Sequence, residues 1–182
     1  NEGFSKANNK AIKYAQGDYI LLLNPDTELE SNQTKEVLDF VKSKNNFGCL
    51  GVRMHDAQGR FLPESKRSIP NMLNSFKKLF FNSKDENTKS YYRNDIDEYG
   101  IAEVEVITGA FLLCERQKYL DIGGLDEDYF MYGEDIDLCY TFMLNSYQNY
   151  YYGAMSILHI KGESTTKDKV YLDRFYGAMD IF

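Results

Sequence analysis

The sequence is poor in several residue types, and each shortage argues against a class of protein. It contains no tryptophan, three prolines and three cysteines in 182 residues. The cysteines, Cys49, Cys114 and Cys139, are odd in number, widely spaced and set among apolar neighbours. This usage argues against a disulfide-rich secreted scaffold and predicts small buried thiols in a reducing compartment. Because no CxxC pair occurs, a cysteine-bound zinc site is not favoured either.

Long apolar runs and an excess of basic residues are also missing. No run approaches the roughly 20 residues that span a bilayer, so we expect a cytoplasmic protein that could touch a membrane, such as the inner face of the plasma membrane, only at its surface. The net charge of −7 and the pI near 4.9 argue against a general affinity for nucleic acid,. The length is suited to one well-buried domain, residues 1–182,.

The pattern of apolar residues alternates between helical and strand periods and predicts an α/β fold. Five consecutive apolar residues, Tyr19 to Leu23, indicate a strand buried on both faces of a sheet,. Further strands are expected at 47–54, 103–107, 108–114 and 150–158, and helices at 5–16, 115–122, 134–146, 171–182 and after a cap at Ser31 or Asn32,. An α/β sheet seldom begins with a helix, so we expect further elements before residue 1.

The segment from residue 63 to residue 98 differs from the rest, because it is polar and mixed in charge. We interpret it as a long surface excursion on the acceptor side, with a short amphipathic helix around Met72 to Phe81,. That helix either packs on its own domain or contacts a membrane or an acceptor.

Four polar residues stand at ends of predicted elements. Asp26 follows the first strand after Pro25, Glu134 and Asp135 open a helix, and His159 stands where the last strand ends. Such ends can converge at one rim of an α/β sheet, where acids and a histidine would suit Mg²⁺ or Mn²⁺ and a transfer reaction. A helix start favours a charged carboxylate, as a general base requires. Each residue also has a plainer interpretation, as a turn residue, a helix-start residue or a surface histidine.

Several segments resemble, in their residues and in their order, the family 2 glycosyltransferases, especially the rhamnosyltransferase-like branch. The matching segments are 1–9 (NEGFSKANN), 17–27 (GDYILLLNPDT), 108–113 (TGAFLL), 123–127 (GGLDE) with 130–138 (FMYGEDIDL), and 159–164 (HIKGES). The resemblance implies a GT-A fold, a Rossmann-like mixed sheet flanked by helices that binds a nucleotide-sugar through a divalent cation. In this chain the fold would be incomplete at its N-terminus.

The same resemblance assigns roles to individual residues. Asp26 would hold the cation on the diphosphate, and His159 would be a further contact to metal or diphosphate. Asn24 would lie near the ribose or sugar, although it departs from the stricter Asp-x-Asp pattern of the family. Gly109 and Ala110 would line the donor sugar. Asp135 would deprotonate the acceptor hydroxyl, with Glu134 beside it in the acceptor region.

The predicted activity is inverting transfer of a sugar to a hydroxyl of a glycan or lipid-linked acceptor in cell-surface polysaccharide synthesis. The alternatives are a nucleotidyltransferase of sugar activation and a non-catalytic glycan-binding domain. Because most of the family's nucleotide-base pocket would lie before residue 1, we expect this chain alone to bind donor weakly or not at all.

Overall fold

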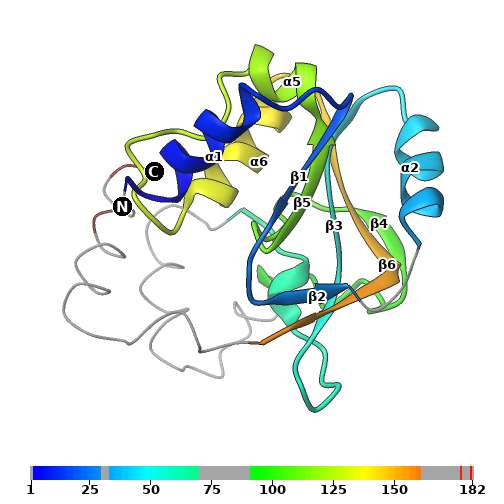
Figure 1. The fold of residues 1–182 in the computed structure, drawn as a ribbon. Helices are drawn as coiled ribbons and strands as arrows, with labels where there is room; N and C mark the ends of the chain where they lie inside the picture. Colours follow the sequence, from blue (N-terminus) through cyan, green and yellow to red (C-terminus); the bar gives the residue numbers. More distant parts are fainter. Residues whose placement is uncertain (1, 30–32, 70–90, 161–176, 178–180, 182) are drawn as a thin grey trace.

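A mixed six-stranded sheet forms the centre of the part of the chain that the computed structural model describes, residues 2–29, 33–69, 91–160, 177 and 181 (Figure 1). The strands are β1 (Tyr19–Leu23), β2 (Thr27–Leu29), β3 (Phe47–His55), β4 (Ile101–Glu103), β5 (Phe111–Glu115) and β6 (Gln148–His159). The helices are α1 (Phe4–Ile12), α2 (Thr34–Lys42), the 3₁₀ turn η1 (Pro63–Ser65), α5 (Arg116–Asp121) and α6 (Glu134–Leu144).

The strands pair in the order β1-β5-β3-β6-β2, and β4 pairs with another part of β6. β3 and β6 are parallel, whereas β5 is antiparallel to both β1 and β3. It follows that β1, β3 and β6 all point the same way and end at one edge of the sheet. The loop before β5 lies at this edge as well, because β5 runs in the opposite direction. The predicted mixed α/β architecture is therefore confirmed.

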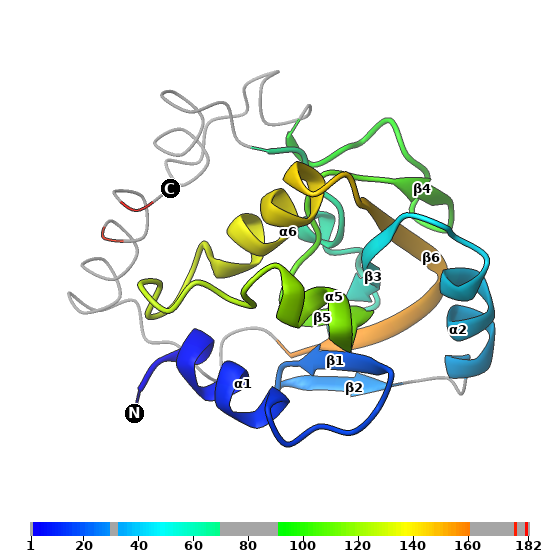
Figure 2. The same ribbon diagram turned by 90° about the horizontal axis from the view of Figure 1, so that it is seen from above.

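Helices cover both faces of the sheet, with α1, α5 and α6 on one side and α2 on the other (Figure 2). Ile12 of α1, Tyr119 of α5 and Phe142 of α6 pack in one hydrophobic core. Val37 and Val41 of α2 pack in a second core. β3 lies between the two cores and is buried along its whole length. None of the described helices is long and apolar enough to cross a bilayer.

The prediction that β1 is buried on both faces is wrong. Ile20 and Leu22 are buried, but Leu21 and Leu23 are each 39% exposed. β1 lies at the end of the strand order and pairs only with β5 in the described sheet. Leu21 and Leu23 lie opposite Leu113 and Phe111, on the face of the sheet that α2 covers. The buried residues of α2 pack over the middle of the sheet rather than over these two leucines.

Other predicted elements exist with different bounds. The expected strand 103–107 ends at Glu103, because Val106 pairs with Arg67 instead of continuing along β6. The expected strand 108–114 begins only at Phe111, after a turn, and the first helix ends at Ile12. β2 was not predicted. The proposed caps at 31 and 32, the amphipathic helix at 72–81 and, apart from residues 177 and 181, the closing helix lie outside the described residues.

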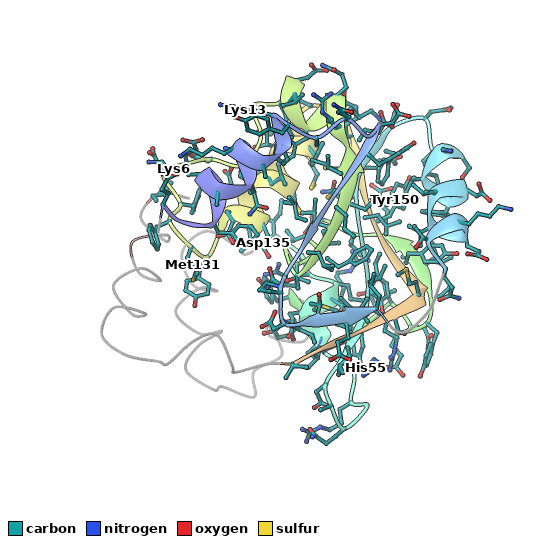
Figure 3. All side chains as sticks on the ribbon, in the orientation of Figure 1. Lys6, Lys13, His55, Met131, Asp135 and Tyr150 are labelled. Carbon is teal, nitrogen blue, oxygen red and sulfur yellow. The ribbon has the colours of Figure 1, made fainter. Side chains whose placement is uncertain are left out.

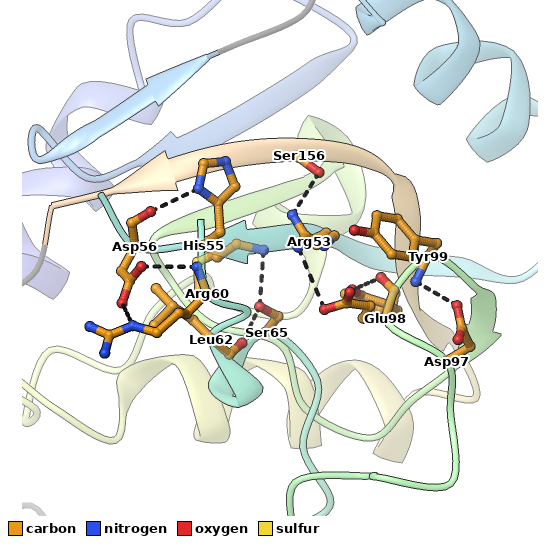
Figure 4. A network of polar contacts seen from close by, with 12 residues as sticks. Arg53, His55, Asp56, Arg60, Leu62, Ser65, Asp97, Glu98, Tyr99 and Ser156 are labelled. Atoms are coloured by element: carbon orange, nitrogen blue, oxygen red, sulfur yellow. Dashed lines mark hydrogen bonds and ion pairs between the residues drawn. The ribbon is translucent and has the colours of Figure 1, made fainter. Parts of the chain in front are cut away.

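A polar network attaches the end of the 63–98 segment to the sheet (Figure 4). Arg53 of β3 is buried, with its guanidinium 3.5 Å from Glu98, 3.4 Å from the hydroxyl of Ser156 and 4.7 Å from the ring of Tyr99. The 98–100 turn packs so closely on β6 that a Cβ at Gly153 would lie 2.5 Å from the carbonyl of Glu98. The C-terminal end of this segment is therefore an integral part of the fold.

Candidate functional site

Asp26 and His159 meet at the edge where β1 and β6 end. Asn24 and Pro25 follow β1, and a turn closes as the backbone N–H and the hydroxyl of Thr27 both donate to the carbonyl of Asn24, at 3.2 and 2.7 Å. Thr27 pairs with His159 across β2 and β6, and Ile160 N–H donates to the Asp26 carbonyl at 2.8 Å. As a result, His159 Nε2 lies 3.4 Å from Asp26 Oδ1, and both side chains are mostly shielded from solvent.

This pair fits a cation that is shared with a phosphate ligand. It supplies one carboxylate and one imidazole, and His159 Nδ1 has no hydrogen-bond partner among the described residues. In the part of the chain that the structure describes, no group of three or more His, Cys, Asp or Glu side chains could hold a metal. Mg²⁺ is usually held by one or two carboxylates together with substrate phosphates, and such a site needs few protein ligands.

A second group of residues surrounds the carboxylate of Asp135 in the first turn of α6, where Figure 3 labels it. Oδ2 accepts a hydrogen bond from Arg67 Nη2 at 2.6 Å and from Gly109 N–H at 3.2 Å. Oδ1 accepts one from Ile136 N–H at 2.8 Å. Only 11% of the Arg67 side chain and 16% of the Asp135 side chain are exposed. The acid is therefore fixed in one orientation by three donors.

Sequence reasoning did not identify Arg67. It lies at the start of the 63–98 segment, which was interpreted as a surface excursion, and a single arginine there carries no distinctive motif. Its pairing with Val106 and its contact with Asp135 depend on residues far along the chain. Burial is the largest single influence and lowers the pKa of the Arg67 guanidinium, but the charges and hydrogen bonds of Asp135 and Tyr91 together outweigh it and raise that pKa above its ordinary value,.

Glu134 lies beside Asp135 in a different environment. Burial, followed by the charge of Asp135, raises the pKa of Glu134 to about 7, although Arg67 and nearby backbone N–H groups oppose the change. Its Oε2 atom is buried and has no hydrogen-bond partner among the described residues. A carboxyl group that titrates near neutral pH at the start of a helix is typical of a site that transfers protons.

The backbone that leads into α6 adopts an unusual conformation. Tyr132 and Gly133 both have positive φ, at 74° and 87°. Left-handed backbone is costly for a tyrosine, and such strain occurs preferentially at functional sites. The start of α1 supports this loop, because Phe4 N–H donates to the Phe130 carbonyl at 2.9 Å. Gly3 is required there, since a Cβ would lie 2.8 Å from the same oxygen.

The turn before β5 connects the two groups. Asn24 N–H donates to the Ala110 carbonyl at 3.1 Å, and the adjacent Gly109 N–H donates to Asp135. The neighbouring residues Gly109 and Ala110 therefore link Asp135 to the strand end that carries Asn24 and Asp26. Ala110 itself is 2% exposed and packs in the core on the α2 face. A Cβ at Gly109 would make an ordinary 3.6 Å contact with that of Asp135, so this neighbour alone does not require glycine.

Curated relatives of this chain are glycosyltransferases. The chain is 29% identical over 171 residues to rhamnosyltransferase WbbL of Escherichia coli (strain K12). The matched region covers 86% of this chain and 60% of that protein. It is 29% identical over 154 residues to N-acetylglucosaminyl-diphospho-decaprenol L-rhamnosyltransferase of Mycobacterium tuberculosis (strain ATCC 25618 / H37Rv), covering 83% and 50% of the two chains. The chain therefore spans about half to three fifths of the length of these relatives.

Solved structures share the fold. GalNAc-T7, crystallised with UDP, GalNAc and Mn²⁺, superposes with a TM-score of 0.64 at 12% identity, covering 100% of this chain and 35% of that chain. TarS residues 1–349 of S. aureus give a TM-score of 0.54 at 18% identity, covering 98% and 43%. At these identities the likeness concerns the fold alone, which is GT-A-like. The family model for glycosyl transferase family 2 matches residues 1–104. The chain belongs to glycosyl transferase family 2.

Proposed function

We propose that the protein is an inverting glycosyltransferase that moves a sugar from a nucleotide-sugar donor to a hydroxyl of a glycan or lipid-linked acceptor. The observation that carries the proposal is the placement of Asp135. Its carboxylate is oriented by Arg67, Gly109 and Ile136, and the Gly109–Ala110 turn connects it to the strand end that leads to Asp26.

The proposed mechanism divides the work between the two groups. Asp26 and His159 would hold Mg²⁺ or Mn²⁺, which when bound offsets negative charge on the diphosphate leaving group. Asp135 would accept the proton of the acceptor hydroxyl as its oxygen attacks the anomeric carbon. A single displacement through an oxocarbenium-like transition state inverts that carbon. Glu134 would lie beside the acceptor, and Asn24, Gly109 and the backbone of Ala110 beside the donor.

The names of the relatives support the choice of substrates. The mycobacterial relative is named for transfer of L-rhamnose to a diphospho-decaprenol-linked sugar, and a Haloferax volcanii relative, 25% identical over 194 residues, is named as a hexosyltransferase of glycan biosynthesis. We therefore propose a role in cell-surface polysaccharide synthesis, carried out in the cytoplasm at the inner face of the plasma membrane. The family match favours sugar transfer over nucleotidyl transfer or simple glycan binding.

The experiment is a screen of the full-length protein with a panel of nucleotide-sugars, with Mg²⁺ and with Mn²⁺, followed by Asp135→Asn. The variant should lower transfer by about 10²–10⁴-fold, the usual contribution of a general base, while donor affinity stays nearly unchanged. Asp39→Asn is a matched control, because Asp39 is exposed on α2 on the opposite face of the sheet. Wild-type turnover in Asp135→Asn would remove Asp135 from the mechanism.

A further inference from the structure

We propose that Arg67 is a positioning residue for the general base: it holds Asp135 through Oδ2 and so directs Oδ1 toward the acceptor hydroxyl. The inference rests on the proposed function of Asp135. Neither the sequence motifs nor the comparisons assign Arg67 a role. Its contacts with the site assign one.

Arg67 is anchored at both its backbone and its side chain. Its N–H and carbonyl form a two-way pair with Val106, at 2.9 and 3.0 Å. Its Nη2 atom donates to the Ile107 carbonyl at 2.8 Å and to Asp135 Oδ2 at 2.6 Å. The segment that carries Val106 and Ile107 leads directly into Gly109, which donates to the same Asp135 oxygen. The guanidinium therefore fixes the acid relative to the turn that is proposed to line the donor sugar.

The hydrogen bonds also distinguish the two oxygens of Asp135. A carboxylate has about four lone-pair sites, two on each oxygen. On Oδ2 both sites are used, by Arg67 and by Gly109. On Oδ1 one site is used, by Ile136 N–H. Among the described contacts, the site that remains to accept a proton is on Oδ1, which is the oxygen that the acceptor hydroxyl should approach.

The test compares Arg67→Lys and Arg67→Gln in the full-length protein. A lysine keeps the charge, but its single ammonium on a shorter stem replaces two nitrogens: Nη2, which reaches Asp135 and the Ile107 carbonyl, and Nη1, which reaches the Tyr91 hydroxyl,. Both variants should lower kcat by about 10²-fold, as expected for a misplaced catalytic group, with the donor KM nearly unchanged.

Arg60→Gln is the matched control, because Arg60 pairs with Asp56 at the exposed turn after β3 and should affect neither quantity. A purely structural role for Arg67 would raise the donor KM together with the fall in kcat, and that result would overturn the proposal. The NMR chemical shift of the Asp135 carboxyl carbon, compared between wild type and Arg67→Gln at one pH, needs no turnover. Equal chemical shifts would refute the role of Arg67, whereas a changed chemical shift in a protein that transfers no sugar would refute only the proposed function.

Discussion

The two acids at the start of α6 are neighbours in sequence but differ in their surroundings. Asp135 accepts hydrogen bonds from an arginine and two backbone N–H groups. Glu134 is buried beside it, and burial together with the Asp135 charge raises its pKa to about 7. A carboxyl group whose pKa is raised by burial beside a second acid holds a proton closer to neutral pH than an ordinary glutamate does.

Glu134→Gln should therefore remove a pH-dependent loss of stability. The folded pKa of about 7 lies above the ordinary value of 4.5, so between these values the folded protein binds more protons than the unfolded chain. The free energy of unfolding must then fall as pH rises through this window. A neutral glutamine has no such cost. From pH 4.5 to pH 8, the stability of the variant relative to wild type should rise by up to about 3 kcal/mol.

Urea unfolding at the two pH values measures this difference. Glu36→Gln is the control, because Glu36 is exposed on α2 and its replacement should leave the pH dependence of wild type unchanged. If Glu134→Gln and wild type lose stability in parallel as pH rises, Glu134 does not bind the additional proton in the folded state.

The sequence predicted the polar residues at the ends of elements, but it did not predict Arg67, which orients Asp135. Asp26, Glu134, Asp135 and His159 follow or open elements whose periodicity is clear, and the structure brings Asp26 to His159 and Asp135 to Gly109. Arg67 follows no element of comparable length, and its partners come from the 104–107 segment and α6. Such long-range pairs leave no periodic signal in a single sequence.

At the scale of elements, the entry to α6 depends on two consecutive left-handed residues. The start of the helix at Glu134 was predicted from its acids, but the positive φ of Tyr132 could not be, because tyrosine seldom adopts it,. Gly133 at the N-cap position has φ of 87° and is the residue type that tolerates this conformation,. The direction in which Glu134 and Asp135 enter the site is set there.

Gly133→Ala should lower both stability and transfer. An alanine in left-handed backbone costs about 1–2 kcal/mol, and relief of this strain would displace the first turn of α6. Gly59→Ala is a closely matched control, because Gly59 has φ of 76° and a Cβ there would meet nothing within 4 Å. Both variants should lose similar stability in thermal melts, but only Gly133→Ala should lose turnover. Equal effects on turnover would show that the geometry of the loop does not control the site.

At the scale of the whole molecule, the class of the fold was predictable while the order and direction of the strands were not. The reversed direction of β5 arises from pairing residues 111–115 with 19–23 and with β3, contacts that local periodicity does not encode. β6 pairs with β4 near its start and with β2 at its end, and this divided pairing was equally invisible. Composition and periodicity define the layers, whereas long-range pairing decides which strand lies at the edge.

The three cysteines report on the integrity of this core. Cys49, Cys114 and Cys139 are free and buried, as the sequence predicted. Cys49 Sγ lies 3.8 Å from Cys139 Sγ, and Cys49 lies opposite Cys114 across β3 and β5. Burial raises the pKa of the Cys49 and Cys114 thiols, and the thiol form reacts poorly with alkylating reagents,.

Maleimide labelling followed by peptide mass spectrometry should therefore leave all three cysteines unmodified in the native protein and modify all three in guanidinium chloride. If only the unfolded chain reacts, native labelling should be slower by about 10³-fold or more, the usual range of unfolding equilibria. Ser43→Cys, at an exposed position after α2, provides a thiol that should react quickly under native conditions. Native labelling of Cys49, Cys114 or Cys139 at the rate of that thiol would show that the core opens without global unfolding.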